Sequence, residues 1–262
     1  MDKSPIGLFD SGIGGTSIWK EVIKLLPNEN TIYLADSKNA PYGEKSAEEI
    51  ISLCVKNTEL LISKGCKLII VACNTATTNA IDYLRKNYTI PFIGIEPAIK
   101  PAALYSKTGA IGILATKGTL ASKLFEKTAN EYTKNITTVE QDGDGLVPLI
   151  EQGKLDSKEM KNLLEKYLKP MLNFNIDHLV LGCTHYPYLI PQIKEIIGDD
   201  IKIIDSGEAV AKQTKAILEK HELVAGIPNK HPHQFYINTD KKVLKQILSD
   251  STADFFISEL EF

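Results

Sequence analysis

The sequence contains almost no arginine: Arg85 is the only one among 262 residues, and lysine supplies the other basic side chains. The formal net charge is −3, so nothing in the composition indicates a surface for nucleic acid or an anionic membrane. A small carboxylate ligand would find hardly any guanidinium group to bind it. We therefore expect backbone N–H groups and hydroxyls to hold such a ligand.

Long apolar runs and targeting segments are lacking as well. No run approaches the roughly 20 apolar residues that span a bilayer, and Met1–Pro5 leads straight into an apolar stretch with no sign of a signal peptide. The four cysteines, Cys54, Cys66, Cys73 and Cys183, form no C-x-x-C pair and are too few for a disulfide scaffold. These absences favour a cytoplasmic protein with reduced thiols.

Short apolar runs alternate with longer amphipathic segments along nearly the whole chain. This alternation is typical of β-α-β units and of a mainly parallel sheet. The predicted strands are Ile6–Asp10, Thr31–Asp36, Leu68–Cys73, Phe92–Glu96, Ala110–Ala115, Ile136–Glu140, His178–Cys183 and Lys202–Asp205. The sequence therefore predicts an α/β fold of the doubly wound, parallel-sheet class.

The clearest predicted helix runs from about Ala47 to Lys64. Ser46 and Glu49 can form a capping box at its start. Cys54 lies on the apolar stripe of this helix, and Cys66 follows just after its end. Both thiols are therefore predicted to be buried in the core.

A faint internal repeat divides the chain in two. Cys73 and Cys183 each end an apolar strand before polar residues and lie 110 positions apart, while the similar segments 7–11 and 112–116 lie 105 apart. Ligands bind beyond the carboxyl ends of the strands in open parallel sheets. We thus predict two pseudo-symmetric domains that face each other across an active-site cleft. The predicted first domain comprises residues 1–97 and 208–262, and the second comprises residues 98–207.

Two thiols at equivalent strand ends suggest acid–base chemistry. Cys73 and Cys183 each precede a predicted helix N-terminus, where free N–H groups and the helix dipole favour a thiolate. A thiolate can remove a proton from one face of a stereocentre while a thiol delivers one to the other face. The alternatives are two structural cysteines or a zinc site of Cys73, Cys183 and His185. The polar flanks of both cysteines argue against the first, and the poor C-x-H spacing argues against the second.

The glycine-rich loop from Asp10 to Gly15 resembles a dinucleotide fingerprint, with Asp36 near the ribose-binding position. However, Ser17 replaces the third glycine, and Asp10 would place a negative charge beside the pyrophosphate. The loop suits a small carboxylate or amine better. Asp10 could bind an ammonium group or tune a thiol, while Ser11 and the loop N–H groups cradle an oxygen.

Two further residues have both a structural and a functional interpretation. His185 lies two residues beyond Cys183, where it can assist the thiol or donate to a developing dianion, although a lone histidine is usually structural. Tyr42 lies in a turn between Pro41 and Gly43. In the functional interpretation this rigid turn presents the tyrosine to a ligand, and in the structural interpretation it is an ordinary surface turn.

With these residues the sequence resembles the glutamate racemases of the aspartate/glutamate racemase superfamily. The matching blocks are residues 9–15 (FDSGIGG), 40–43 (APYG), 72–76 (ACNTA), 147–151 (VPLIE), 182–187 (GCTHYP) and 205–206 (DS). The two cysteine blocks together are highly specific, and the opening block separates glutamate racemases from aspartate racemases. Near the C-terminus the resemblance is weaker, because residues 235–240 lack the glycine expected before Asp240.

The resemblance implies a two-domain isomerase that needs neither a cofactor nor a metal, acts on glutamate as a homodimer, and supplies D-glutamate for peptidoglycan. Cys73 would be the base toward D-glutamate and Cys183 the base toward L-glutamate, assisted by Asp10, His185 and Glu151. The implied substrate contacts are Asp10, Ser11, Pro41, Tyr42, Gly43, Asn74, Thr75, Thr116, Thr119, Thr184 and His185. The alternatives are a racemase for aspartate or another amino acid, a two-lobed module that binds a small acid without chemistry, and a nucleotide-dependent oxidoreductase.

Overall fold

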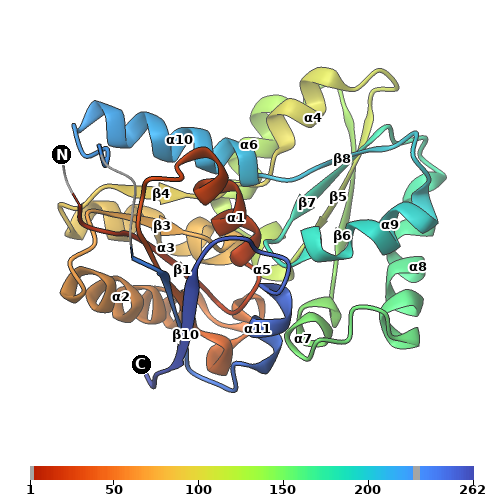
Figure 1. Cartoon of the computed structure of the whole chain (residues 1–262). Helices are drawn as coiled ribbons and strands as arrows, with labels where there is room; N and C mark the ends of the chain where they lie inside the picture. The colour runs from red at the N-terminus through yellow and green to blue at the C-terminus, as the bar shows by residue number, and fades with distance from the viewer. Residues whose placement is uncertain (1–2, 227–230) are drawn as a thin grey trace.

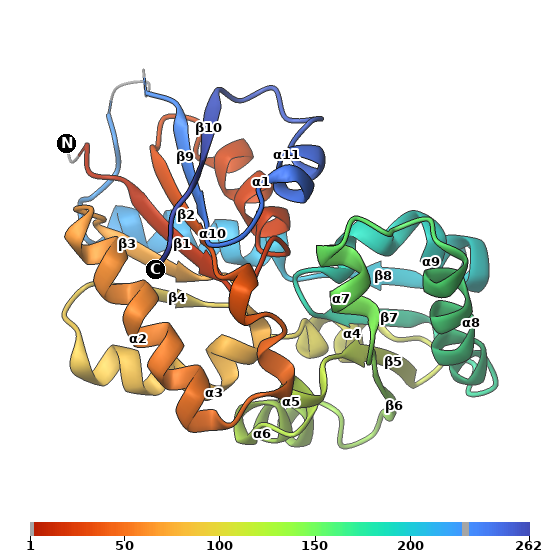
Figure 2. The ribbon, with the colours of Figure 1, turned by 90° about the horizontal axis from the view of Figure 1, so that it is seen from below.

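The computed structural model describes residues 3–226 and 231–262 and consists of two lobes (Figure 1). The first lobe is built on a six-stranded sheet of order β10-β9-β2-β1-β3-β4, and the second on a four-stranded sheet of order β6-β5-β7-β8. All pairings in both sheets are parallel. The predicted α/β, parallel-sheet class is confirmed. Figure 2 shows the two sheets side by side with helices on both faces.

The strands of the first sheet are β1 (Ile6–Asp10), β2 (Thr31–Ala35), β3 (Leu68–Val71), β4 (Phe92–Gly94), β9 (His233–Ile237) and β10 (Phe255–Glu259). Those of the second are β5 (Ala110–Ala115), β6 (Thr137–Asp142), β7 (His178–Gly182) and β8 (Lys202–Ile204). The predicted eight strands are therefore present with small shifts at their ends. β9 and β10, which extend the first sheet beyond β2, were not predicted from the sequence.

The helices of the first lobe are α1 (Thr16–Leu25), α2 (Ala47–Ser63), α3 (Asn74–Asn87), α10 (Gly207–Lys220) and α11 (Lys242–Ile247). Those of the second are α4 (Ile99–Tyr105), α5 (Lys117–Leu120), α6 (Lys123–Tyr132), α7 (Leu146–Glu151), α8 (Lys158–Leu172) and α9 (Ile190–Ile197). Short 3-10 helices are η1 (Ser37–Asn39), η2 (Tyr42–Glu44) and η3 (Tyr186–Leu189).

Strand β1 is fully buried because both faces of its sheet are covered. Ile6 and Leu8 belong to a cluster with Trp19 of α1, whereas Phe9 belongs to a cluster with Leu61 of α2. This alternation follows from the two-residue period of a strand. It leaves the carboxyl end of β1 as the place where Asp10 meets the other lobe.

Helix α2 has the predicted capping box. Ser46 Oγ accepts from Glu49 N at 3.2 Å, and Glu49 Oε2 accepts from Ser46 N at 2.9 Å. The thiols of Cys54 and Cys66 are buried, as predicted. Burial raises the pKa of Cys54 and raises that of Cys66 to about 12, so neither is a reactive thiolate.

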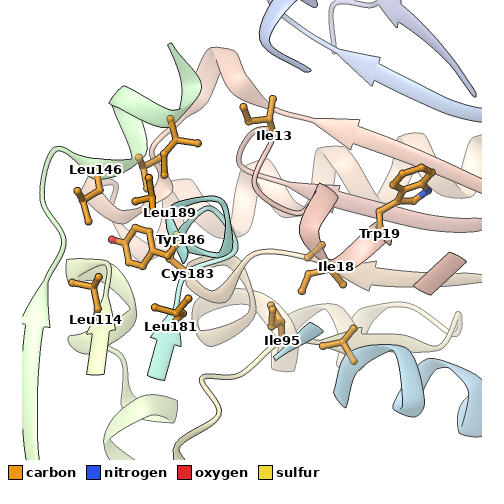
Figure 3. Close-up of a cluster of buried hydrophobic side chains, with 14 of the residues drawn as sticks. Ile13, Ile18, Trp19, Ile95, Leu114, Leu146, Leu181, Cys183, Tyr186 and Leu189 are labelled. Carbon is orange, nitrogen blue, oxygen red and sulfur yellow. The ribbon is translucent and has the colours of Figure 1, made fainter. Parts of the chain in front are cut away.

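The chain passes between the lobes twice, before α4 and before α10. The two crossing segments touch, because Ser206 Oγ donates to the carbonyl oxygen of Glu96 at 2.5 Å. A continuous apolar cluster also joins the lobes. Figure 3 shows part of it, with Ile13 of the first lobe and Leu146, Tyr186 and Leu189 of the second around Cys183.

Candidate active site

The carboxyl ends of strands from both sheets meet at one small cavity. Cys73 follows β3 in the first lobe, and Cys183 directly follows β7 in the second. Both line this cavity, together with Ser11, Pro41, Tyr42, Gly43, Asn74, Thr75, Thr116, Val147, Thr184 and His185. Most of the site residues expected from the sequence thus lie around one space. Asp10, Glu151 and Thr119 lie directly behind its lining.

The cavity measures only about 10 Å³, the room that a single water molecule needs. The cleft is therefore closed around its cysteines. A larger hollow of about 830 Å³ lies between α1, α10 and β8, but its lining, which includes Lys20 and Lys202, contains neither Cys73 nor Cys183. Convergent thiols, amides and hydroxyls identify the functional site better than volume does.

Cys73 is the N-cap of α3, as predicted, and its Sγ accepts from Ala76 N at 3.4 Å. Ser11 Oγ lies 3.7 Å from the same sulfur. Burial nevertheless raises the pKa of Cys73 well above its ordinary value, and the charge of Asp10 adds to this effect. The expected thiolate stabilisation by the helix N-terminus is thus outweighed in the closed site.

Cys183 differs from the expectation, because no α-helix begins directly after it. Thr184 and His185 form a turn, the short η3 begins at Tyr186, and α9 begins only at Ile190. The prediction of a helix N-terminus at Cys183 was wrong. The His185 side chain instead supplies the polar partner of this thiol, with Nδ1 lying 3.7 Å from Sγ.

The His185 ring contacts Cys183 on one side and Glu151 on the other. Its Nε2 lies 2.6 Å from Glu151 Oε1, and its side chain is 1% exposed. Burial alone would lower the pKa of His185, but the hydrogen bonds to Cys183 and Glu151 outweigh burial and raise it well above its ordinary value. This shift favours the protonated imidazole, whose Nδ1 faces the thiol and whose Nε2 faces the carboxylate, with Gly14 N also 3.2 Å from Nε2.

The glycine-rich loop leaves room for the side chains of Glu151 and His185. A Cβ at Gly12 would lie 2.0 Å from Glu151 Oε1, and one at Gly14 would lie 2.2 Å from His185 Nδ1. Only glycine lets the two side chains of the second lobe approach the loop so closely. Ile13 N donates to Glu151 Oε1 and Gly14 N lies 3.2 Å from His185 Nε2, so these loop N–H groups are not free for a pyrophosphate.

Asp10 receives the loop N–H groups that we expected to cradle a ligand oxygen. Its carboxylate accepts from Ser11 N at 2.6 Å and from Gly15 N. Thr184 Oγ1 of the second lobe donates to it at 3.2 Å. Burial raises the pKa of Asp10, and the nearby His185 charge opposes this rise. With Ser11 Oγ, which donates at 3.2 Å, four donors hold this buried carboxyl beside Cys73, one of them from across the cleft.

The two residues that follow Cys73 also carry polar side chains at the cavity. Both amide atoms of Asn74 are buried without a hydrogen bond among the residues that the structure describes. Thr75 Oγ1 lies 2.8 Å from Thr116 Oγ1 and 3.3 Å from Thr119 Oγ1 across the lobes. Such groups can bind the oxygens of a small carboxylate without an arginine.

Tyr42 lines the cavity, but its hydroxyl points elsewhere. It donates to Asp36 Oδ2 at 2.5 Å and accepts from Asn57 Nδ2 at 3.2 Å. Asp36 is therefore occupied by protein groups, including Asn238, and not poised for a ribose. The ring of Tyr42 supports the turn, and Pro41 and Gly43 beside it line the cavity.

The sequence analysis missed two residues of the site. Val147 lines the cavity, and Ser37 Oγ donates to Glu151 Oε2 at 2.8 Å. Val147 lies in a matching block that could have indicated it, but Ser37 had no local signal. Across residues 3–226 and 231–262, no group of three or more His, Cys, Asp or Glu side chains is arranged to hold a metal ion.

Comparison with known proteins decides the family. Residues 11–214 match the family described as Asp/Glu/Hydantoin racemase. The chain belongs to this family. A glutamate racemase from Herpetosiphon aurantiacus is 45% identical to it over 224 residues, which cover 86% of this chain and 88% of that protein.

Two solved structures of family members agree with this assignment. Glutamate racemase from Francisella tularensis, solved in complex with D-glutamate, has a TM-score of 0.83 and 30% identity, with 98% of each chain covered. The Escherichia coli glutamate racemase, solved with L-glutamate and the activator UDP-MurNAc-ala, has a TM-score of 0.87 and 29% identity, again with 98% of each chain covered. This chain is therefore an amino-acid racemase, an enzyme of the isomerase class. In the part of the chain described, no helix is long and apolar enough to cross a membrane.

Proposed function

We propose that this racemase interconverts L- and D-glutamate by proton transfer between Cys73 and Cys183, without a cofactor. The observation that carries the proposal is the shared cavity, whose wall contains one cysteine from each lobe. A planar intermediate between two thiols can lose a proton on one face and gain one on the other. The bound D- and L-glutamate in the two relatives described above support glutamate as the substrate.

The proposed roles follow from the contacts of each thiol. Cys73 removes the α-proton of D-glutamate with Asp10 beside it, and Cys183 removes that of L-glutamate with the charged His185 beside it. The charged imidazole stabilises the Cys183 thiolate when Cys183 acts as the base. Glu151 holds His185 in place. In each direction, the thiol that is not the base delivers the proton.

The substrate carboxylates would be bound by uncharged donors. The Asn74 amide has no partner in the closed cavity, and the hydroxyls of Ser11, Thr75, Thr116 and Thr184 come from both walls. Thr119 supports Thr75 and Thr116 from behind. Pro41, Tyr42 and Gly43 line one side of the cavity. A Cβ at position 43 would lie 3.2 Å from Thr116 Cβ, a tight contact that glycine avoids.

The cavity must widen before glutamate can bind, because about 10 Å³ is too small for it. We propose residues 1–97 and 208–262 as one moving domain and residues 98–207 as the other. The pairing of β9 with β2 and the contact of Ser206 with Glu96 at the crossings support this division. Closure then brings Asp10, Glu151 and the two thiols together around the substrate.

We further propose that the enzyme acts in the cytoplasm as a homodimer and supplies D-glutamate for peptidoglycan, as the family resemblance implies. One other function competes: racemisation of aspartate or another amino acid. The unpaired amide atoms of Asn74 fit either substrate, so measured rates on each substrate separate these possibilities.

The deciding experiment is circular dichroism of L-glutamate incubated with pure, cofactor-free protein. The signal should decay to zero, and it should decay likewise from D-glutamate. Iodoacetamide should stop the reaction, and glutamate should protect against it. Retention of optical activity would refute racemisation of glutamate, and faster decay with aspartate would refute glutamate as the preferred substrate.

A further inference from the structure

Glu151 binds donors from both lobes, although it belongs to the second. It is the last residue of α7, and its Oε1 lies 2.6 Å from His185 Nε2 in the same lobe. The first lobe supplies two donors: Ile13 N reaches Oε1 at 2.7 Å, and Ser37 Oγ reaches Oε2 at 2.8 Å. The carboxylate that orients His185 is therefore itself oriented from across the cleft.

Ser37 is held firmly in its position. It begins η1 directly after Asp36, whose buried carboxylate accepts from Asn39 Nδ2 at 2.7 Å and from Asn238 Nδ2 at 2.5 Å. Tyr42 donates to the same carboxylate. The segment that carries Ser37 is thus anchored to the body of the first lobe through β9, so the hydroxyl has a defined place when the lobes close.

We propose that Ser37 is a positioning residue for Cys183: its hydroxyl holds Glu151 across the cleft, and Glu151 in turn holds His185 against the Cys183 thiol. The proposal rests on the two-cysteine mechanism proposed above. Ile13 N binds only the oxygen that His185 shares, so Ser37 is the donor to Oε2 in the part of the chain described. Opening of the lobes removes both donors, which restricts the correct orientation of His185 to the closed state.

The charged and titratable groups around His185 determine how the loss of the Ser37 hydroxyl changes the pKa of His185. These are Cys183 and Glu151 in direct contact, and Asp10 slightly farther away. Burial alone would raise the pKa of Glu151, but His185, Ile13 N and Ser37 outweigh burial and lower it. Loss of the Ser37 hydroxyl leaves Glu151 Oε2 without its donor, so the carboxylate can turn away from His185 Nε2 and its attraction for the imidazole falls with distance. His185 then holds its proton less tightly and stabilises the Cys183 thiolate less.

The first test isolates one thiol at a time. With 3-chloroglutamate, removal of the α-proton expels chloride and leaves an enamine, which water converts to a 2-oxo acid and ammonia. The L-form needs only Cys183 as a base and the D-form only Cys73. Ser37→Ala should slow elimination from the L-form roughly tenfold, the usual scale for a lost charge-assisted hydrogen bond, and leave the D-form within about twofold. Ser37→Thr, which keeps a hydroxyl, should restore the L-form rate.

A second test does not depend on activity. The side-chain nitrogens of ¹⁵N-labelled His185, assigned by their loss in His185→Asn, should titrate at a lower pH in Ser37→Ala than in the wild type. Ser63→Ala is the matched control, because the exposed Ser63 donates only to Leu60 O at 2.8 Å, far from the cavity. It should change neither the titration nor the elimination rates.

Equal slowing of both enantiomers, or an unchanged His185 titration in Ser37→Ala, would overturn the role of Ser37. Inactivity of the wild type toward both glutamate enantiomers would instead overturn the proposed function. The titration would still decide whether Ser37 acts on His185 through Glu151.

Discussion

His185 Nε2 lies 2.6 Å from Glu151 Oε1, and the two side chains are 1% and 14% exposed. Burial opposes the charge on each residue, but their mutual attraction prevails. The pKa of His185 is raised, with Cys183 contributing, and that of Glu151 is lowered. The two shifts have opposite signs, so the pair stabilises the fold over a defined range of pH.

We predict that Glu151→Gln destabilises the protein by about 3 kcal/mol near neutral pH, because it leaves a buried charged imidazole without its counter-charge. The contribution of Glu151 is lost as pH falls through its lowered pKa. The contribution of His185 is lost as pH rises through its raised pKa. Urea unfolding at a series of pH values should therefore show the largest difference in unfolding free energy between the wild type and Glu151→Gln near pH 6. This difference should shrink at higher and at lower pH, by about 1 kcal/mol or more below pH 4.

Glu165→Gln is the control for this prediction. Glu165 pairs with Lys169 at 2.7 Å on the exposed surface of α8, where such pairs contribute little. A pH-independent effect of Glu151→Gln would show that its carboxylate does not pair with a charged His185.

Substrate carboxylates should be bound without arginine. Arg85 lies in the last turn of α3 and donates to Phe92 O at 3.3 Å, away from the cavity. Arg85→Lys should therefore change KM for glutamate less than about twofold, whereas Thr184→Ala should raise KM about tenfold through a lost hydrogen bond to substrate and to Asp10. Initial rates across glutamate concentrations measure both. A KM that rises with Arg85→Lys alone would contradict this binding scheme.

Gly14→Ala should reduce kcat by a hundredfold or more, on the scale of a roughly 1 Å misplacement of catalytic groups. The new Cβ would lie 2.2 Å from His185 Nδ1 and must push the ring away from Cys183. Gly198→Ala is the control, since its Cβ meets nothing within 4 Å but its φ of +77° costs stability. We expect Gly198→Ala to lower the melting temperature and leave kcat unchanged. Similar kcat values for the two variants would exclude a role for the His185 position.

The central strands were predictable because each is a short, wholly apolar run between turns, as β1 and β7 are. Strands β9 and β10 were missed for a physical reason. β9 alternates buried and half-buried residues, and β10, at the edge, has no fully buried residue. β9 pairs with β2, some 200 positions earlier, and β10 pairs in turn with β9, which no local pattern reveals.

In the site, too, local sequence patterns predicted individual residues but not the contacts between distant ones. Cys73, Cys183 and Asp10 could be predicted, because each stands at the end of an apolar strand. Local rules misjudged the thiol of Cys73, since its N-cap position favours a thiolate but its burial, which depends on the opposite lobe, raises its pKa. The role of Ser37 could not be predicted either, because it exists only through contact with Glu151, 114 positions away.

The last prediction concerns the two faces of the α-carbon. With one cysteine from each lobe serving one face, the first product formed in D₂O should carry deuterium at Cα while unreacted substrate stays protiated, as mass spectrometry of early time points can measure. Either Cys→Ala variant should abolish racemisation, because each direction needs a base and an acid. Each variant should still eliminate chloride from one enantiomer of 3-chloroglutamate, Cys183→Ala from the D-form and Cys73→Ala from the L-form. The same enantiomeric preference in both variants would refute the two-face arrangement, even if the wild type racemises glutamate.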